Sequence, residues 1–518
     1  MKTHKQEHAL DFNDQFLAAL NLLENTHQNV FITGRAGTGK STLLNYFREN
    51  TEKNIAVLAP TGVAAVNIKG QTVHSFFKFK PNVTMDAIKK EKKKETLYQK
   101  LDAIIIDEIS MVRADLLDCV DRFLRLNGKD ENKPFGGIQM LFIGDLYQLP
   151  PVVASQEREI FRSHYATPYF FSAHCFQDFD MELIELEKIY RQKDTVFIDL
   201  LNSIRNNSIT EEGLAAINQR YNPDFEPPAD DFYIYLTPTN ALAKIINDKQ
   251  LEKTKGKAYA FCADVSGTFG QEYFPTSLEL ILKIDAQIMM LNNDAGNRWI
   301  NGTIGKVIDV AKDESGDQFI TVKLEDGNTV DVYPYQWEIY KFYLEDSLLK
   351  SEAVGTFTQY PLMLAWALTI HKSQGKTFDK VVFDIGNGSF AHGQTYVALS
   401  RCTSLQGIVL KKPLSKGHIW MDHNVVRFLT KYQYQKSEAL CSAEEKMELI
   451  KKAIHNQEDI NIIYLKANDE KSRRVLKPRV VGPMEYSGKT YLGMEAFCHA
   501  RQETRMFRVD RILEILQK

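Results

Sequence analysis

The sequence has few cysteines, no long apolar run and almost no net charge. Its six cysteines lie far apart, without a CxxC pair or the Cys/His spacing of zinc sites. This pattern argues against a disulfide scaffold and favours a reduced, cytoplasmic compartment. The most apolar stretch, 360–370, has about half the length that spans a bilayer, and residues 1–13 lack the apolar core of a secretory leader. We therefore expect no membrane partner.

The formal net charge is only −3 over 518 residues, so a surface that binds nucleic acid has to be local. Hydrophobic residues make up 44% and charged residues 25%, which is typical of a globular protein rather than a fibrous or disordered one. Internal repeats and low-complexity segments are missing as well. A chain of this length predicts roughly three to five compact units.

Short apolar runs alternate with helical stretches in the first third of the chain. We predict a helix at 41–49 and strands at 29–33, 54–59, 103–106 and 139–143, which together indicate a parallel sheet covered by helices. A second α/β unit begins with a strand at 232–236 and a helix at 240–251. Short strands within 285–343 interrupt this unit, and apolar runs return after residue 360. The predicted fold class is α/β, with a small β unit inserted into the second α/β unit.

Residues 34–41 read GRAGTGKS and fit the P-loop pattern GxxxxGK[ST], between a predicted strand and a predicted helix. The glycines let successive backbone N–H groups point at phosphates, and the following helix adds the positive end of its dipole. Lys40 would reach the β- and γ-phosphates, and the Ser41 hydroxyl would ligate Mg²⁺. A plain glycine-rich turn is the alternative, which the flanking strand and helix disfavour.

Two carboxylates, Asp107 and Glu108, end the apolar strand at 103–106. Functional groups of parallel sheets gather at the carboxyl ends of the strands. We therefore predict that Asp107 holds Mg²⁺ through its water shell and that Glu108 is the general base for an attacking water. Gln148, after the strand at 139–143, could contact the γ-phosphate or the water. A strand followed by Asp-Glu can also be a surface turn, so this prediction depends on the upstream P-loop.

These residues make the chain resemble the PIF-type (petite integration frequency) DNA helicases, which belong to the 5′-to-3′ class of helicase superfamily one. The resemblance covers roughly 29–434, most of the chain. A block at 115–139 that ends in PFGGIQ resembles the segment that separates this family from RecD-type helicases. The other matching motifs are APTGVAA at 59–65, TVHSF at 72–76, DEISM at 107–111, GDLYQLPP at 144–151, YRQ at 190–192, TIHKSQG at 369–375 and YVALSR at 396–401.

The resemblance implies two RecA-like domains with ATP and Mg²⁺ between them. It suggests a first domain at 1–190 with a small insertion at about 76–100, a second domain at 191–284 and 361–435, an SH3-like insertion at 285–360, a linker helix at 436–456 and a C-terminal module at 457–518. Arg191 and Arg401 would both come from the second domain and reach the γ-phosphate as arginine fingers. Either arginine could instead form a surface salt bridge.

The matching motifs also imply the site residues. Those expected at the nucleotide are Gly34, Ala36, Gly37, Thr38, Gly39, Lys40, Ser41, Thr42 and Gly375, with Ser41 and Asp107 also at the metal. Those expected to act in hydrolysis are Lys40, Asp107, Glu108, Gln148, Arg191 and Arg401. Those expected at single-stranded DNA are Pro60, Thr61, His74, His371 and Lys372. Either histidine could instead be structural.

Some positions are open to two interpretations. Gln15, upstream of the P-loop, is a candidate for the family's adenine contact, whereas Phe12 and Phe16 at helical spacing are predicted to be core. Trp299 is predicted to be core rather than a stacking surface. The lysine-rich segment 89–100 is a solvated helix or the family's small insertion at the point of strand separation.

The segment 462–515 resembles a WYL-type module, a small Sm- or SH3-like β-barrel. The matching residues are Tyr464, RVLKP at 474–478, Tyr491-Leu492 and FRVDRI at 507–512, whereas Thr490 stands where the naming Trp is expected. Such modules are thought to bind nucleic acid or an anionic ligand, and Lys and Arg outnumber Asp and Glu by ten to four between 471 and 511. The candidate contacts are Arg474, Arg479, Arg505 and Arg508. A domain-docking barrel with solvated arginines is the alternative.

The predicted function is that of an ATP-dependent DNA helicase or translocase. It would bind single-stranded and forked DNA, move 5′ to 3′ and act as a monomer. The alternative is an ATP-gated DNA-binding switch that never unwinds and is regulated by the WYL-type module. A fused relaxase or nuclease would need a paired-histidine metal motif or a second carboxylate cluster, and the sequence has neither outside the ATP site. Stimulation of ATP hydrolysis by single-stranded DNA distinguishes the helicase from the switch.

Overall fold

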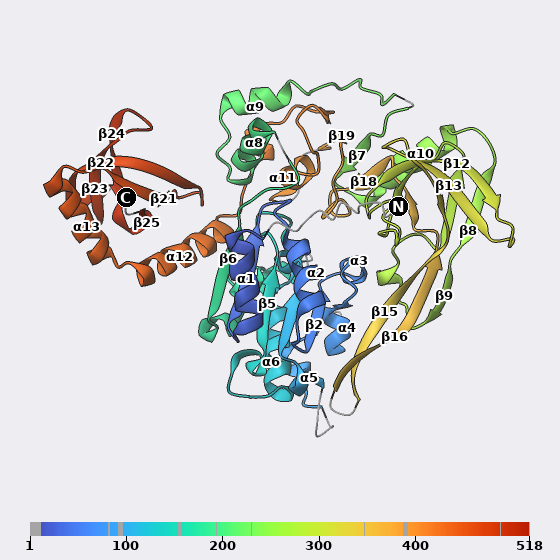
Figure 1. Cartoon of the computed structure of the whole chain (residues 1–518), viewed down its shortest axis with the longest axis horizontal. Coiled ribbons are helices and arrows are strands. Elements are labelled where there is room, and N and C mark those ends of the chain that lie inside the picture. Colours follow the sequence, from blue (N-terminus) through green and yellow to red (C-terminus); the bar gives the residue numbers. More distant parts are fainter. Residues whose placement is uncertain are drawn as a thin grey trace, which may run out of the picture. The chain divides into compact units, whose positions relative to one another are not determined.

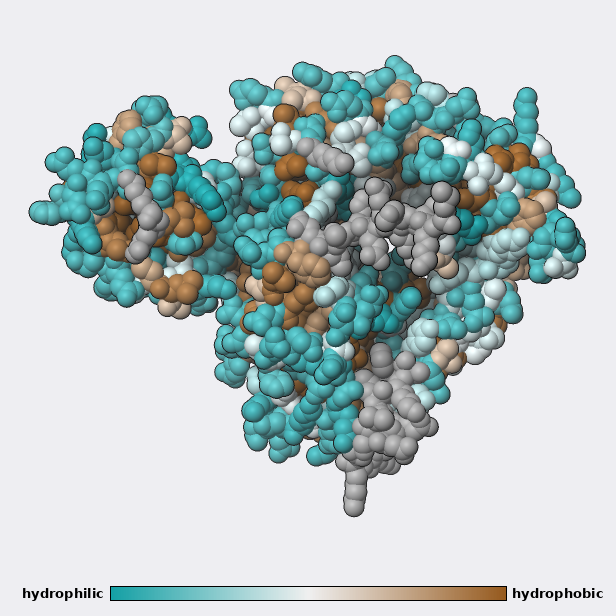
Figure 2. Space-filling model, viewed as in Figure 1, coloured by the Kyte–Doolittle hydropathy of each residue, from teal (hydrophilic) through white to brown (hydrophobic). Residues whose placement is uncertain are grey.

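The computed structural model describes residues 12–80, 83–91, 97–153, 157–192, 194–228, 230–345, 348–386, 392–486 and 488–516. The chain forms two compact units, the first comprising Met1–Leu201 and Thr210–Ile419 and the second Asn202–Ile209 and Trp420–Lys518. Figure 1 shows the elements of each unit. Figure 2 shows a mainly hydrophilic face with hydrophobic side chains in smaller areas. Among the described residues, no helix combines the length and the apolarity needed to cross a bilayer.

The first unit contains a six-stranded parallel sheet in the order β3-β2-β4-β5-β1-β6. Its strands are β1 (Asn29–Gly34), β2 (Ile55–Ala59), β3 (Gln71–Thr72), β4 (Ala103–Ile106), β5 (Gln139–Ile143) and β6 (Met181–Leu186). The predicted strands of this region are all present, each within a residue of its expected ends. β4 and β5 are buried throughout, as continuous apolar strands of a sheet covered on both faces are. Because every strand is parallel, the P-loop, Asp107, Glu108 and Gln148 all lie at the same edge of the sheet.

The helices of this part are α1 (Asp14–Asn25), α2 (Lys40–Asn50), α3 (Gly62–Asn67), α4 (Val73–Phe77), α5 (Leu97–Lys100), α6 (Ala114–Asn127) and α7 (Arg158–His164). α1 and α2 share a core with the sheet that contains Phe16, as predicted. Phe12, by contrast, is 40% exposed, so its prediction as core was wrong. Residues 92–96 of the lysine-rich segment lie outside the described part of the chain. The C-terminal end of that segment contains Tyr98, which packs on Phe123 with ring centroids 4.7 Å apart.

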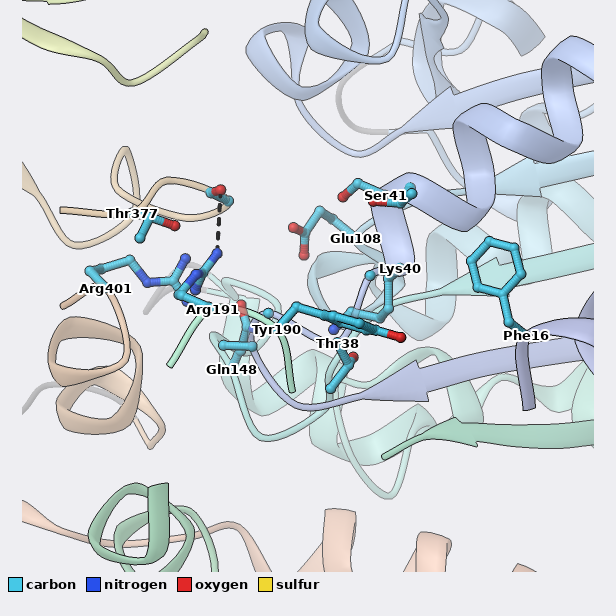
Figure 3. Close-up of a pocket in the computed structure, with 15 residues that line it drawn as sticks. Phe16, Thr38, Lys40, Ser41, Glu108, Gln148, Tyr190, Arg191, Thr377 and Arg401 are labelled. Carbon is cyan, nitrogen blue, oxygen red and sulfur yellow. Dashed lines mark hydrogen bonds between the residues drawn. The ribbon is translucent and has the colours of Figure 1, made fainter. Parts of the chain in front are cut away.

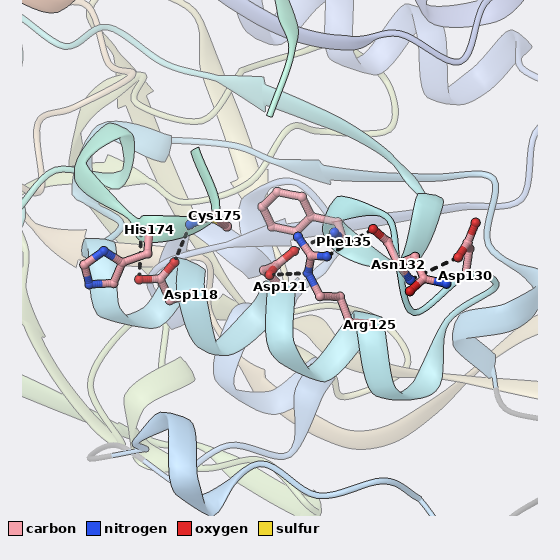
Figure 4. A network of polar contacts seen from close by, with 8 residues as sticks. All are labelled: Asp118, Asp121, Arg125, Asp130, Asn132, Phe135, His174 and Cys175. Carbon is pink, nitrogen blue, oxygen red and sulfur yellow. Dashed lines mark hydrogen bonds and ion pairs between the residues drawn. The ribbon is translucent and has the colours of Figure 1, made fainter. Parts of the chain in front are cut away.

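The family-specific block folds as α6 and a tight turn that buried carboxylates hold in place (Figure 4). Asp121 accepts the Phe135 N–H at 2.6 Å and the Arg125 Nε–H at 2.7 Å. Phe135 needs this support because its φ of 52° lies in the left-handed region. Asp118 accepts two further backbone N–H groups, from residues 174 and 175. The block therefore fastens the PFGG turn to α6.

A second parallel sheet has the order β18-β7-β19-β20. Its strands are β7 (Ile234–Thr237), β18 (Ala367–Thr369), β19 (Val381–Phe383) and β20 (Ile408–Leu410), and its helices are α8 (Thr195–Arg205), α9 (Glu211–Asn218), α10 (Asn240–Lys253) and α11 (Gln394–Leu399). β7 and β18 pair although the whole inserted β unit lies between them in sequence. The second α/β unit is therefore interrupted by a β unit, as predicted.

The inserted β unit extends beyond 285–360 at both ends. One antiparallel sheet contains β11 (Gln287–Met290), β12 (Ile304–Lys312), β13 (Gln318–Leu324), β14 (Thr329–Val332) and β17 (Leu362–Leu364), a second contains β9 (Asp264–Gly267), β15 (Tyr335–Glu345) and β16 (Leu348–Gln359), and a third contains β8 (Ala258–Cys262) and β10 (Glu279–Lys283). β8, β10 and the first of these sheets contribute to one hydrophobic core. Trp299 is 6% exposed in that core, as predicted.

The second unit contains helices α12 (His423–Leu440) and α13 (Ala443–Asn456). The prediction of a single linker helix at 436–456 is therefore wrong, because two helices share this range. The chain leaves the helix at Cys441 and restarts with Ser442, the N-cap of α13, in a capping box with Glu445. Ile450 and Ala453 of α13 are buried in the core of the C-terminal sheet, so α13 belongs to that module.

The C-terminal sheet is antiparallel, with the order β24-β23-β22-β21-β25. Its strands are β21 (Ile460–Leu465), β22 (Lys471–Tyr486), β23 (Lys489–Cys498), β24 (Glu503–Arg508) and β25 (Ile512–Leu516). In the described part of the module, the edge strands β24 and β25 do not pair with each other. The expected barrel is therefore not closed by hydrogen bonds, and the short turn η9 (Val509–Arg511) joins the two edges.

Candidate active site

The P-loop runs from the end of β1 into α2. Gly37 and Gly39 have φ values of 80° and 88°, in the left-handed region that glycine adopts without strain. Gly39 is the N-cap of α2, so the first backbone N–H groups of this helix do not donate to acceptors within it. Lys40 Nζ donates to the carbonyls of Gly34 and Arg35 at 2.7 and 3.0 Å, which holds the ammonium along the loop. The loop therefore has the backbone geometry that binds phosphate.

A cavity of about 690 Å³ borders this loop, a volume typical of small-molecule and cofactor sites. Figure 3 shows its lining, which comprises Phe16, Ala36, Gly37, Thr38, Gly39, Lys40, Ser41, Thr42, Glu108, Gln148, Tyr190, Arg191, Gly375, Thr377 and Arg401. Gly375, Thr377 and Arg401 come from the second sheet's side, so both parallel sheets contribute. Of the residues predicted at the nucleotide or in hydrolysis, Gly34 and Asp107 do not line the cavity.

The carboxylates of Asp107 and Glu108 follow β4, as predicted. Asp107 Oδ1 accepts the Glu108 N–H at 2.9 Å, and Glu108 has a left-handed φ of 49°. Burial, and then the neighbouring Asp107, raise the pKa of Glu108 to about 7, while Lys40 opposes the rise. Burial also raises the pKa of Asp107. A carboxyl group with a pKa near neutrality suits a general base, and the pair offers a cation partly buried oxygen ligands.

The loop after β5 places Gln148 at the cavity wall. Gln148 Nε2 donates to Asp145 Oδ2 at 3.2 Å, and Asp145 Oδ1 accepts the Tyr147 N–H at 3.1 Å. Gly393, the N-cap of α11, lies so close that a Cβ there would be 2.3 Å from the Tyr147 carbonyl oxygen. The loop that carries Gln148 is therefore packed against the start of the helix that leads to Arg401.

Arg191 does not come from the second domain, contrary to the expectation from sequence. It follows β6, an edge strand of the first sheet, and the Tyr190 N–H donates to the Gly37 carbonyl at 2.8 Å. A Cβ on Gly37 would lie 2.5 Å from the Arg191 Cβ, so the backbone of Arg191 rests on the P-loop. Its guanidinium donates to the carbonyls of Ser400 and Gly375 at 3.2 and 3.5 Å. Arg191 therefore bridges the two sides of the cavity.

Arg401 comes from the second sheet's side, directly after α11, as predicted. It is 1% exposed and donates to the Val397 carbonyl and the Ser400 hydroxyl at 2.9 and 3.1 Å. Burial, and then the nearby Arg191, lower the pKa of Arg401 to about 9. Figure 3 shows the two arginines next to each other, across from Glu108. Two adjoining guanidinium groups favour an anionic ligand at this point of the cavity.

The sequence assigned no role to several residues at the cavity. Phe16, Tyr190 and Thr377 line it. The Tyr396 hydroxyl accepts the Ala36 N–H at 3.1 Å, which joins α11 directly to the P-loop. Tyr190 and Tyr396 lie in motifs that carried the family resemblance, so a signal was present for them. No sequence signal placed Phe16 or Thr377 at the cavity, because their position there depends on how the chain packs.

Gln15, the candidate adenine contact, lies in the first turn of α1 beside Phe16. Its Oε1 accepts the Glu187 N–H at 3.0 Å, just beyond β6. Gln15 does not line the cavity. An adenine contact for Gln15 stays a prediction.

The predicted DNA contacts lie just beyond the carboxyl ends of parallel strands, in two groups. Pro60 and Thr61 follow β2, with Thr61 as the N-cap of α3, and His74 lies in α4 after β3. His371 and Lys372 follow β18 and are exposed. None of these residues lines the cavity. Loops with hydroxyl and basic groups suit contacts to phosphates that do not depend on base sequence.

Two parallel sheets, a P-loop and a cavity that both sheets line define a P-loop NTPase with a RecA-like core. A family model described as PIF1-like helicase matches residues 12–213. ATP-dependent DNA helicase Pif1 of Bdellovibrio bacteriovorus is 32% identical over 414 residues, which cover 78% of this chain and 88% of that protein. The chain belongs to the PIF1-like helicase family, as its motifs predicted.

Solved structures support the same family. Pif1 from Bacteroides sp in complex with ADP-AlF4 is 36% identical and has a TM-score of 0.75, covering 82% of this chain and 98% of that one. Bacteroides Pif1 bound to single-stranded DNA, also 36% identical over the same shares of the two chains, has a TM-score of 0.59. A WYL domain model matches residues 445–516, a range that includes most of α13. The C-terminal module is therefore a WYL domain that begins earlier than the expected residue 457.

Proposed function

We propose that this chain couples hydrolysis of ATP to movement along single-stranded DNA, and thereby separates duplex strands in the 5′-to-3′ direction that its family resemblance implies. The observation that carries the proposal is the cavity between the two parallel sheets. One side supplies the P-loop and Glu108, and the other supplies Arg401. Binding of ATP therefore favours closure of the two sides, and loss of the γ-phosphate removes a ligand that both sides hold.

In the proposed hydrolysis, each residue has a separate task. The P-loop N–H groups and Lys40 hold the β- and γ-phosphates, and Glu108 takes a proton from the water that attacks the γ-phosphorus. Arg401 and Arg191 stabilise the charge that develops on the transferred phosphoryl group. Gln148, which lines the cavity, orients the water in this proposal. Because Arg191 rests on the P-loop, hydrolysis depends on domain closure mainly through Arg401.

Mg²⁺ fits the residues at this site. Ser41 and Asp107 offer hard oxygen ligands. Burial raises the pKa of Asp107 by removing water from its carboxyl group, although Lys40 opposes the rise, and a bound cation would favour the ionised form. Mg²⁺ usually needs one or two carboxylates together with substrate phosphates, so the lack of a three-residue acidic cluster among the described residues does not conflict with it. The ion would supply charge neutralisation at the phosphates.

Contact with single-stranded DNA is proposed for the two groups of loops that follow β2, β3 and β18. Pro60, Thr61 and His74 lie on the first sheet's side, and His371 and Lys372 on the second. Alternating opening and closure of the cavity would change the spacing between these groups, which moves a bound strand. Bacteroides Pif1 has been solved with single-stranded DNA, which supports this choice of partner. We extend the proposal to forked DNA and to a monomeric helicase.

Steady-state ATPase with and without oligo-dT tests the proposal on the full chain. We expect strong stimulation of the wild type, and a Lys40→Ala variant that binds oligo-dT without hydrolysing ATP. Strand separation of a forked duplex by the wild type, and none by Lys40→Ala, completes the test. A flat response to DNA would instead favour the ATP-gated switch, and unwinding by Lys40→Ala would refute the assignment of the P-loop.

For the WYL domain we propose binding of an anionic ligand such as nucleic acid, with Arg479 as the main contact. Arg508 is engaged with Asp510 at 2.5 Å, and Arg505 lies 3.6 Å from Glu503. Arg479 is exposed at the register shift in β22. Arg479→Ala should weaken binding of labelled oligo-dT to the full chain, whereas Arg505→Ala should not.

A cytoplasmic location stays a prediction.

A further inference from the structure

A continuous line of hydrogen bonds leads from the nucleotide cavity to helix α3. Arg401 Nη1 donates to the carbonyls of Ser373 and Lys376 at 3.4 and 3.5 Å. Lys376 Nζ donates to Asn301 Oδ1 at 2.5 Å, and Asn301 Nδ2 donates to Asn67 Oδ1 at 3.2 Å. We call this line, from Arg401 through Lys376 and Asn301 to Asn67, the polar relay. It joins the second sheet's side, the inserted β unit and the first sheet's side.

The members of the polar relay lie beside the nucleotide cavity, in the inserted β unit and at the end of α3. Lys376 stands between Gly375 and Thr377, which both line the cavity. Asn301 lies in the turn that precedes β12 of the inserted unit. Asn67 is the last residue of α3, whose N-cap is the predicted DNA contact Thr61. The relay thus ends on α3, the helix that begins at the loop predicted to contact DNA through Thr61.

The chemistry of the two side chains sets the direction of the Asn301 amide. An ammonium group can only donate, so the Asn301 oxygen has to face Lys376. The amide NH₂ is then left for Asn67. Burial lowers the pKa of Lys376 to about 8, which shows that its ammonium has lost most of its water. In the described part of the chain, Asn301 is the side chain that accepts a hydrogen bond from this ammonium.

The two links of Asn301 differ in strength. The link to Lys376 is partly buried and charge-assisted, whereas the link to Asn67 joins two neutral groups at the surface. Asn301 is therefore linked more strongly to the loop after β18 than to α3. Of these two links, the one to Asn67 is the easier to break when the two sheets separate.

We propose that Asn301 and Lys376 are positioning residues that couple closure of the nucleotide cavity to the placement of α3 at the DNA. When the cavity closes on a nucleotide, the loop carrying Lys376 moves with Arg401 and brings the Asn301 amide onto Asn67. The helix with Thr61 at its start is then held in one position. Neither Asn301 nor Asn67 lines the cavity, so neither residue acts on the nucleotide directly. This inference rests on the proposed function, because it presumes that DNA and ATP binding are coupled.

The experiment measures that coupling directly in the full chain. Affinity for fluorescein-labelled oligo-dT is determined by anisotropy without nucleotide and with ADP–aluminium fluoride, and the ratio of the two is the coupling factor. The ATPase rate is measured with and without saturating oligo-dT. For Asn301→Ala we expect a coupling factor and a DNA stimulation about fivefold to tenfold smaller, with DNA-independent ATPase within about twofold of the wild type.

Three further variants separate the links, and a fourth is the control. Asn301→Asp keeps the oxygen that faces Lys376 but loses the NH₂ group, so it should behave like Asn67→Ala, with a partial loss of coupling. The double variant Asn301→Ala/Asn67→Ala should be no worse than Asn301→Ala, because both changes break the same link. Asn328→Ala is the matched control, since among the described residues its side chain bonds to Asp326, a near neighbour in the same inserted unit. It should keep the wild-type coupling factor.

The outcomes distinguish this inference from the proposed function. A wild type that DNA does not stimulate would refute the proposed function, and the relay with it. A stimulated wild type with an unchanged coupling factor in Asn301→Ala would overturn the relay alone. Additive effects of Asn301→Ala and Asn67→Ala in the double variant would overturn it as well, because independent sites add. If Asn301→Ala melts early, the surface variant Asn67→Ala still decides the question by its coupling factor.

Discussion

The environment of Glu108 predicts a particular dependence of ATP hydrolysis on pH. Its pKa is raised to about 7, first by burial and then by Asp107. A general base has to be ionised, so kcat/KM for ATP should rise about tenfold between pH 6 and pH 8 and then level off, as the ionised fraction does. Glu108→Gln should lower kcat by about 100- to 10,000-fold and should lose this acid limb.

The same shift has a consequence for stability, with a definite sign. An ordinary glutamate ionises near 4.5, so between that pH and 7 the unfolded chain gives up its proton while folded Glu108 keeps it. Stability is therefore lost as pH rises through this window, by about 3 kcal/mol at pH 8. Glu108→Gln removes the buried charge. The nucleotide-free variant should melt at a higher temperature than the wild type at pH 8 and at the same temperature near pH 4.5.

A second variant isolates the role of the neighbouring carboxylate. Asp107→Asn removes the charge that contributes to the raised pKa of Glu108, so its residual activity should show an acid limb shifted to lower pH. The pH–rate profile is measured at low ATP, where kcat/KM reports the free enzyme. Wild-type turnover by Glu108→Gln, or a flat wild-type profile from pH 6 to 8, would refute the assignment of Glu108 as the base.

Three other changes give defined expectations. Asp121→Ala leaves the buried Phe135 N–H without its acceptor and should lower the free energy of unfolding by about 1–3 kcal/mol in urea titrations; an unchanged midpoint would contradict this. Arg401→Ala should lower ATP turnover about 1,000-fold with ATP affinity largely kept, and Arg401→Lys should not restore it. Gly37→Ala places a Cβ 2.5 Å from the Arg191 Cβ at a φ of 80°, so binding of a fluorescent ATP analogue should be lost; wild-type affinity would show that this contact is dispensable.

The strands and the P-loop could be predicted because each depends on a few consecutive residues. β4 needs only an apolar run long enough for a buried strand, and the carboxylates follow it directly. The P-loop needs glycine where φ is positive, as at Gly37 and Gly39, and a helix directly after it. In a parallel sheet the ends of such strands meet at one edge, so the motifs also predicted that these groups would lie together.

The break between α12 and α13, within the helix expected at 436–456, could not be predicted in this way. The residues of this range keep a helical pattern throughout, and the break at Cys441–Ser442 depends on a capping box and on the core that receives α13. The origin of Arg191 was missed for a related reason. The YRQ motif shows that an arginine is present, but only the pairing of β6 with β1 places it on the P-loop.

The sequence by itself determined the chemistry of this protein, namely a phosphate-binding loop, a carboxylate pair and two arginines in motifs of one helicase family. Only the tertiary structure decided which side of the cavity Arg191 belongs to, how far burial raises the pKa of Glu108, and that Lys376 meets Asn301. The reason is physical. A loop or strand end is shaped by neighbours along the chain, whereas burial, charge interactions and links between sheets arise from groups that folding brings together from distant positions.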